Sequence, residues 1–381
     1  MRPVEVMPRN LSVDIQSLDK SVYYAVIDEY VSRVSRHRGV LCIGQFGTIG
    51  TPGLSDIDLL VVCEDRYYTA ITLYSQEFVR QSALHRYLFW HDVAVVPQGV
   101  VKYLRYIHSL ENLRTVWGNS DILESCEQPD EIVTLFRNIL WNSYFWSLIL
   151  HLCQQDNVSL RLTLMLSKNA ALSVVSNYRL MGNEKYADII ALRAEQERQR
   201  ILGAHPSEQS NLAKVYLWEG IQILSKSDWD LSDWMTRKGL SIRHSGQKKV
   251  RLSQEHTIVF IESYESSQEI LHQHIGETHV TYFPSFYYVV SCLVARPYLQ
   301  LQGALSKIWD TAVAEHIENA TIRSAARKWN EAFVSIFNAL REAGADPESH
   351  ELIVFPFNLK RPISTSLLWA RRLINLVRKY L

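Results

Sequence analysis

The sequence lacks an excess of charge of either sign. Among its 381 residues, 40 lysines and arginines balance 40 aspartates and glutamates. A neutral chain has no overall positive field that would hold a long nucleic acid by neutralising its phosphates. The charge balance therefore argues against a polymeric nucleic-acid substrate and leaves RNA as an alternative partner only through a local basic patch.

Cysteine is scarce, and no two cysteines stand in a Cys-x-x-Cys spacing. The five cysteines lie far apart in the chain, at Cys42, Cys63, Cys126, Cys153 and Cys292. This scatter argues against a disulfide framework and against a zinc site. We therefore expect a reducing, cytoplasmic environment.

Long uninterrupted apolar runs are also missing. The N-terminal segment MRPVEVMPRNLSVDIQ does not contain the apolar stretch of a signal peptide, so export is not expected. The most apolar window, residues 135–153, is interrupted by Arg137, Asn138, Asn142 and His151. These polar residues favour a buried core helix over a membrane span.

What the chain does contain is the composition of a folded protein, with 47% hydrophobic and 21% charged residues. A chain of this length is expected to divide into roughly two or three domains of about 150 residues each. Shifts in pattern predict a small mixed-sheet domain at residues 1–125, a helical domain at 126–240 and a C-terminal α+β region at 241–381. The predicted fold class is therefore α+β.

The N-terminal domain alternates helical and β-rich patterns. The order is helix, strand, glycine-rich loop, strand, helix, strand, over residues 12–36, 40–44, 45–56, 57–63, 68–85 and 87–96. Long helices follow near 130–153, 158–180, 185–201 and 208–226. Beyond residue 240 we expect strands at 256–261, 279–283 and 352–357 and helices at 303–343 and 364–380.

The segment Gly44–Val62, GQFGTIGTPGLSDIDLLVV, carries the clearest chemical signal. Its glycines at 44, 47, 50 and 53 allow positive φ and a close approach of the backbone to a ligand, so that successive N–H groups can point at a triphosphate. Asp56 and Asp58 are two residues apart on the predicted strand, which places both carboxylates on one face. A divalent cation relieves their repulsion, and such oxygen ligands suit Mg²⁺ or Mn²⁺.

A third carboxylate would complete a two-metal site, and the best candidate is Asp92 in FWHDVAVVP. Apolar residues flank Asp92 on what the pattern predicts to be an interior strand. An ionised group in such a strand is rarely left without a partner or a metal. The alternative is a local pair between Asp92 and the neighbouring His91.

These residues resemble the nucleotidyltransferase superfamily of DNA polymerase beta, poly(A) polymerases and aminoglycoside nucleotidyltransferases. Its signature is a glycine-serine pair, a spacer, Asp-x-Asp on a strand and a later third acid. Gly44, the pair Asp56 and Asp58, and Asp92 match these positions over roughly residues 20–110. The family's serine is replaced by Gln45.

The resemblance implies transfer of a nucleotide from a nucleoside triphosphate, with release of pyrophosphate, through in-line attack at a two-metal site. Asp56, Asp58 and Asp92 would hold the ions, and Asp92 could also act as general base. The triphosphate would meet Gly44, Gln45, Thr48 and Ser55, with Thr48 or Thr51 in place of the missing serine hydroxyl. Lys168 would reach it from the helical domain, or else extend its ammonium group to solvent.

The acceptor is expected to be a small molecule or a protein, because the chain is neutral and has 10 Trp and 19 Tyr residues. Two other functions stay open: an inactive nucleotide-binding scaffold, suggested by Gln45, and an RNA-modifying or RNA-binding protein. The second would use the basic C-terminal helix together with a basic cluster. This cluster, which we first interpret as a solvated loop, consists of Arg243, His244, Lys248, Lys249 and Arg251. The histidines His272, His274 and His279 do not have convincing metal-ligand spacing.

Overall fold

The structure, a computed structural model, describes residues 10–110, 112–153, 155, 157–240, 242, 249–251, 257–261, 280–284, 290 and 319–345. Among them, the chain forms two compact units: a sheet unit made of 16–133 and 327–345, and a helical unit made of 10–15 and 134–326. Each unit is described separately. The domain boundaries predicted at residues 125 and 240 stay predictions.

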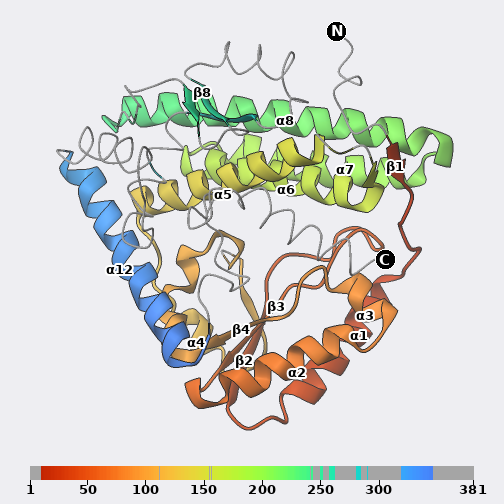
Figure 1. Cartoon of the computed structure of the whole chain (residues 1–381), viewed down its shortest axis with the longest axis vertical. Helices are drawn as coiled ribbons and strands as arrows, with labels where there is room; N and C mark the ends of the chain where they lie inside the picture. The colour runs from red at the N-terminus through yellow and green to blue at the C-terminus, as the bar shows by residue number, and fades with distance from the viewer. Residues whose placement is uncertain are drawn as a thin grey trace. The chain divides into compact units, whose positions relative to one another are not determined.

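The sheet unit contains a four-stranded mixed sheet in the order β4-β3-β2-β5 (Figure 1). Its strands are β2 (Val40–Gln45), β3 (Leu59–Cys63), β4 (Ala94–Pro97) and β5 (Arg114–Gly118). Strand β2 runs antiparallel to β3 and β5, whereas β3 and β4 are parallel. The predicted α+β class with a small mixed sheet is therefore confirmed.

The central strand β3 explains why this part of the sequence is so apolar. All five residues of LLVVC in β3 are fully buried, at 0% exposure. A strand covered on both faces requires a continuous apolar run, and burying each large side chain stabilises the fold by about 1.5–3 kcal/mol. The strand is thus a rigid support for the residues at its N-terminal end.

Helices flank this sheet. They are α1 (Lys20–Val34), α2 (Tyr68–Arg80), α3 (Ala83–Leu88) and α4 (Asp121–Glu124), with short 3-10 segments η2 (Asp65–Tyr67), η3 (Gln98–Tyr106) and η4 (His108–Leu110). Helix α1 begins after Asp19, whose carboxylate accepts a hydrogen bond from the Ser21 N–H. The hydroxyl groups of Tyr30 and Ser75 lie 2.7 Å apart and join α1 to α2.

The strand predicted over 87–96 is wrong in its first half. Ser82 caps a new helix by accepting from the His85 N–H, so Tyr87 and Leu88 end α3 instead of beginning a strand. Strand β4 begins only at Ala94. The aromatic residues 87–90 suggested a strand from sequence, but the N-cap serine determines the local structure here.

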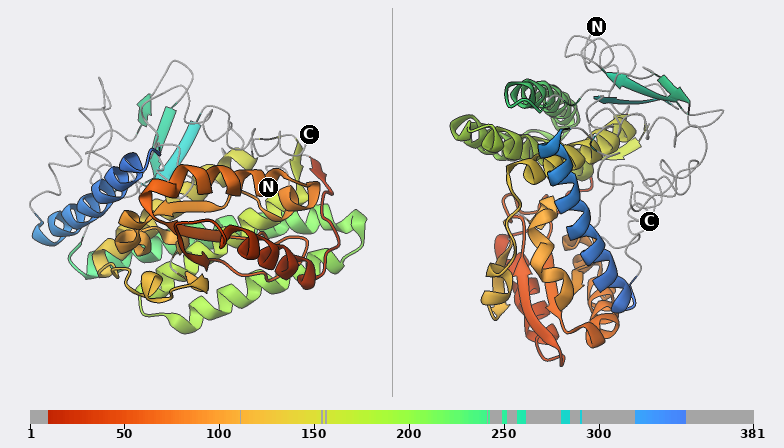
Figure 2. Two further views of the ribbon diagram at one scale, coloured as in Figure 1. Left: turned by 90° about the horizontal axis from the view of Figure 1, so that it is seen from below. Right: turned by 90° about the vertical axis from the view of Figure 1, so that its left-hand side faces the viewer.

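The helical unit contains α5 (Glu131–Cys153), α6 (Leu160–Leu180), α7 (Glu184–Gly203) and α8 (Pro206–Arg237), and the predicted long helices are therefore confirmed. Figures 1 and 2 show α6, α7 and α8 alongside one another. Strands β1 (Asn10–Ser12) and β6 (Asn157–Ser159) pair in parallel. None of the helices in the described part of the chain is long and apolar enough to cross a membrane.

Helix α8 extends past the end predicted near residue 226. The sequence there, Ser-Asp-Trp-Asp, resembles a helix stop because serine and aspartate favour turns. Inside the unit, however, Ser227 accepts from the Asn177 amide at 2.9 Å and Asp228 accepts from the Trp146 indole N–H at 2.6 Å. These buried partners keep both residues in the helix.

The described part of the C-terminal region contains β7 (Lys249–Arg251), β8 (Thr257–Ile261), β9 (Val280–Pro284) and α12 (Ala320–Glu342). From Arg327 onward, α12 belongs to the sheet unit, where Lys328 Nζ lies 2.5 Å from Asp130 Oδ2. The predicted strand 352–357, the predicted helix 364–380, the three histidines and Arg243, His244 and Lys248 lie outside the described residues.

Candidate metal centre

The two aspartates of the Asp-x-Asp motif lie where the chain enters β3. The antiparallel register opposes Gln45 to Leu59, and the Phe46 N–H donates to the Asp58 carbonyl at 3.1 Å. Asp58 therefore directly precedes the strand. The sequence pattern had placed Asp58 inside the strand, and this placement is wrong. The Asp58 backbone is nevertheless fixed by pairing with the residue that follows β2.

Gly47 gives the turn after β2 its close approach to Asp58. Its φ is +74°, and a Cβ at this position would lie 2.5 Å from Asp58 Oδ2. Positive φ and lack of space both require glycine. Among the four glycines expected to adopt positive φ, Gly47 and Gly53 do so.

Two buried tyrosines hold the rest of the glycine-rich loop. The Tyr23 hydroxyl, on α1, accepts from the Gly53 N–H and donates to the Ser55 carbonyl, both at 2.9 Å. The Tyr87 hydroxyl, on α3, donates to the Gly53 carbonyl at 2.5 Å. Because both tyrosines are at most 4% exposed, these bonds are shielded from water and fix the chain just before Asp56.

His91, which follows α3, completes the group. Its Nε2 lies 2.8 Å from Asp58 Oδ1, and its Nδ1 lies 2.8 Å from the main-chain oxygen of Asp92. A carbonyl oxygen only accepts hydrogen bonds, so Nδ1 carries the proton and donates it. The ring lies nearly parallel to that of Phe46, with 6.2 Å between centroids.

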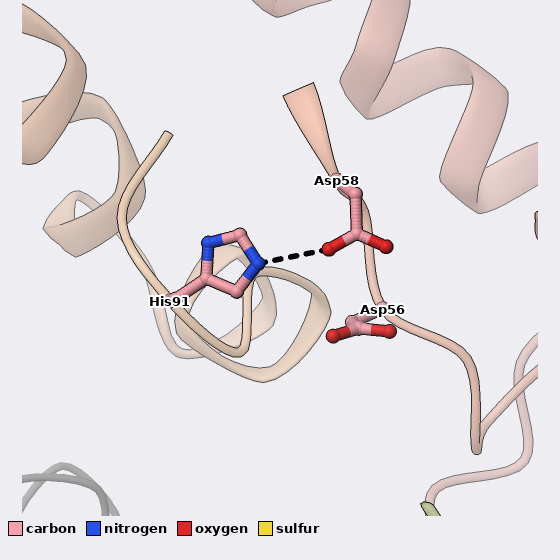
Figure 3. Close-up of side chains that lie close together, drawn as sticks. All are labelled: Asp56, Asp58 and His91. Carbon is pink, nitrogen blue, oxygen red and sulfur yellow. Dashed lines mark hydrogen bonds and ion pairs between the residues drawn. The ribbon is translucent and has the colours of Figure 1, made fainter. Parts of the chain in front are cut away.

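Asp56, Asp58 and His91 form a cluster with the chemistry of a cation site (Figure 3). One ligand atom from each of the three lies within 4.8 Å of the other two. The side chains of Asp58 and His91 are 19% and 32% exposed, so an ion from solvent can reach them. Two carboxylate oxygens and one imidazole nitrogen are suitable ligands for a divalent metal ion. The expected proximity of the two aspartates is confirmed.

The third member of the cluster is His91, whereas the sequence pattern predicted Asp92. Asp92 Oδ2 instead lies 3.4 Å from Arg80 Nη2. Asp92 also precedes β4 instead of lying within it, so the argument from an ionised group in an apolar strand does not apply. His91 directly precedes Asp92 in the sequence, but a motif of three acids does not include a histidine.

Gly44 and Gln45 have structural partners of their own. A Cβ on Gly44 would lie 2.6 Å from a methyl group of Leu113, so glycine allows that leucine to pack against β2. Gln45 is 5% exposed and accepts from Arg114 at 2.9 Å. Both residues are buried and are thus engaged in packing within the sheet unit. Their predicted contact with a triphosphate stays a prediction.

The remaining residues predicted to meet a triphosphate have different environments. Thr48 is exposed next to Gly47, whereas Ser55 is 3% exposed and its hydroxyl accepts from the Thr51 N–H at 3.2 Å. Lys168 lies in α6 of the helical unit, with its Nζ 3.7 Å from Glu195 Oε2. Of Thr48 and Ser55, Thr48 is thus the better placed to meet a ligand at the cluster.

Comparison with known proteins does not assign the chain to a family. No family model matches it, and no curated protein or solved structure matches it either. The resemblance to nucleotidyltransferases therefore stays a prediction from the motif. The case for a function depends on the geometry of the cluster.

Proposed function

We propose that the protein is a metal-dependent nucleotidyltransferase, which transfers a nucleotide from a nucleoside triphosphate to an acceptor and releases pyrophosphate. The observation that carries the proposal is the pair Asp56 and Asp58, whose carboxylates lie close together just before β3, with Asp58 against the glycine turn. The small mixed sheet would then be a nucleotidyltransferase domain. Such a pair is what a reaction of anionic phosphates requires, because bound cations neutralise the developing charge.

Each part of the centre has a role in this proposal. Asp56, Asp58 and His91 would hold a divalent cation, Mg²⁺ or Mn²⁺, which supplies charge stabilisation to the phosphates when bound. Thr48, exposed in the turn, would position the triphosphate by a hydroxyl hydrogen bond. Tyr23 would keep the loop in place through Gly53 and Ser55, so that little reorganisation is needed at the reaction. The proposed acceptor is a small molecule or a protein.

A second candidate is a scaffold that binds nucleotide without turnover. It is favoured by Asp92, whose carboxylate lies beside Arg80 and outside the cluster. The superfamily pattern assigns a third acid to the acceptor hydroxyl, and His91 is not an acid in that position. If His91 cannot replace it, nucleotide binds but no product forms.

The test is incubation of the full chain with each nucleoside triphosphate, Mg²⁺ or Mn²⁺, and a mixture of small molecules and proteins from a cell extract. Pyrophosphate release and mass spectrometry of the mixture detect transfer. We expect product with the wild type and with the control Asp65→Asn, an exposed acid on η2, and none with Asp58→Asn. Transfer by Asp58→Asn would refute the site, and nucleotide binding without product would favour the scaffold.

A further inference from the structure

The ligand set at the cluster contains a nitrogen. The predicted site has three carboxylates, whereas the structure brings together two carboxylates and the His91 Nε2. This difference bears on which ion the centre selects. Mg²⁺ favours oxygen ligands, whereas imidazole nitrogen suits first-row transition metals, whose affinity for nitrogen ligands exceeds that of Mg²⁺.

The orientation of His91 is that of a metal ligand. A ligating histidine almost always donates its other ring N–H to a carbonyl, carboxylate or water, which fixes the ring and directs the lone pair of the first nitrogen at the ion. His91 does this through the Asp92 main-chain oxygen, 2.8 Å from Nδ1, which lies outside the cluster. Phe46, 5% exposed, lies nearly parallel to the ring, with 6.2 Å between the centroids.

The contact between Nε2 and Asp58 brings this nitrogen to the carboxylates. Nε2 lies 2.8 Å from Asp58 Oδ1, and one ligand atom from each of Asp56, Asp58 and His91 lies within 4.8 Å of the other two. Without a metal ion, a second ring proton makes this contact an ion pair between His91 and Asp58. A metal ion bound by all three residues would take the place of that proton.

We propose that this centre is selective for a first-row transition-metal ion and binds Mn²⁺ in preference to Mg²⁺ through Asp56, Asp58 and His91 Nε2. The inference rests on the metal centre of the proposed function but not on transfer itself. The main chain of Asp92 acts as the outer partner that orients His91. The carboxylate of Asp92 stays with Arg80.

Metal binding is measured on the metal-free full chain without any nucleotide. Free Mn²⁺ gives a sharp electron paramagnetic resonance signal that is lost on binding, so a titration gives the affinity and added Mg²⁺ gives the competition. We expect that displacing Mn²⁺ requires an excess of Mg²⁺ of about tenfold or more. Displacement by an equal or lower concentration of Mg²⁺ would overturn the proposal.

Pulsed resonance of the Mn²⁺ complex tests the ligand directly and needs no variant. Coupling of the ion to a single imidazole nitrogen is expected, and its pattern changes when histidine is labelled with the heavier nitrogen isotope. Absence of this coupling in the wild type would overturn the proposal. The measurement stays decisive even where a variant does not fold.

Substitution then identifies the histidine. His91→Asp creates three carboxylates, so it should lose the nitrogen coupling and most of the preference for Mn²⁺. Loss of a residue that only orients a metal ligand weakens metal binding by roughly 10- to 100-fold. His91→Ala removes the ligand itself, so it should weaken Mn²⁺ binding by at least as much. The matched control is His37→Asp, because His37 lies in the same unit, contacts the ring of Tyr74 and does not belong to the cluster. Unchanged coupling in His91→Asp would overturn the assignment.

Failure of this inference and failure of the proposed function give different results. Nitrogen coupling without transfer would leave the metal centre standing and refute the nucleotidyltransferase. Transfer with Mg²⁺ and no nitrogen coupling in the Mn²⁺ complex would support the nucleotidyltransferase and refute His91 as a metal ligand.

Discussion

Gly47 faces the Asp58 carboxylate so closely that a methyl group in its place would lie 2.5 Å from Oδ2. A side chain at residue 47 would therefore displace the Asp58 carboxylate. Because this carboxylate lies 2.8 Å from His91 Nε2, its displacement would also change the contact with His91. This close fit makes the geometry of the centre testable by small substitutions.

Gly47→Ala should destabilise the protein and also weaken Mn²⁺ binding. The positive φ of +74° costs an alanine about 1–2 kcal/mol, and the clash pushes Asp58 away from the cluster. The control is Gly182→Ala, because Gly182 has a φ of +78° and a Cβ added there would have nothing within 4 Å. Denaturant unfolding should show a loss of stability for both variants, at least as large for Gly47→Ala because of the added clash, and Mn²⁺ titration should show a loss for Gly47→Ala alone. Equal Mn²⁺ affinities would contradict the fit.

Tyr23→Phe should loosen the glycine-rich loop. Without the hydroxyl, the Gly53 N–H and the Ser55 carbonyl lose a buried partner, which costs about 1–3 kcal/mol. Hydrogen exchange at Gly53 should accelerate, and unfolding should need less denaturant. Tyr24→Phe serves as the control, because Tyr24 is 51% exposed. Slow exchange at Gly53 in Tyr23→Phe would show that the tyrosine does not hold the loop.

Asp58→Asn should leave the metal-free protein at least as stable as the wild type, because it removes repulsion between Asp56 and Asp58. Mn²⁺ should raise the thermal midpoint of the wild type and leave that of the variant unchanged. At a concentration about a hundred times the dissociation constant, binding stabilises the folded state by about 2.7 kcal/mol. Thermal scans with chelator and with Mn²⁺ measure both effects, and an equal rise in the two proteins would refute Asp58 as a ligand.

Buried thiols should make stability fall at alkaline pH. Burial raises the pKa of Cys42 and of Cys63 to about 12 from 9.0, so each thiol keeps its proton longer in the folded state than in the unfolded one. Their contribution to stability is present below pH 9.0 and is lost as pH rises toward 12. Denaturant midpoints across this interval should fall more steeply for the wild type than for a Cys42→Ala, Cys63→Ala variant. Parallel curves would contradict this account.

Much of the fold follows from local patterns in the sequence. The apolar run of β3 and the helical periodicities of α5, α6 and α7 are clear sequence signals, because each buried position requires an apolar residue. The end of α8 was harder to place, since Ser227 and Asp228 stay helical only through partners on other helices. The packing of α12 on the sheet unit has no local signal at all.

The candidate site, too, could be predicted from the sequence only in part. The proximity of Asp56 and Asp58 was predicted from alternation of side chains along a strand. In the structure both residues precede β3, so the path of the loop, and not strand alternation, brings their carboxylates together. That His91 and not Asp92 joins them depends on the path of the chain between the end of α3 at Leu88 and the start of β4 at Ala94. The sequence of this connection does not indicate which of the two neighbouring side chains meets the aspartates.

The most direct test of the centre is a crystal of the full chain grown with Mn²⁺ and measured at the wavelength where manganese scatters anomalously. The anomalous difference map should show a peak bounded by a carboxylate oxygen of Asp56, a carboxylate oxygen of Asp58 and Nε2 of His91, at distances of roughly 2.0–2.3 Å, in the range for divalent ions with oxygen and nitrogen ligands. A map with no peak among these three side chains, from a crystal in which they are well ordered, would contradict the account.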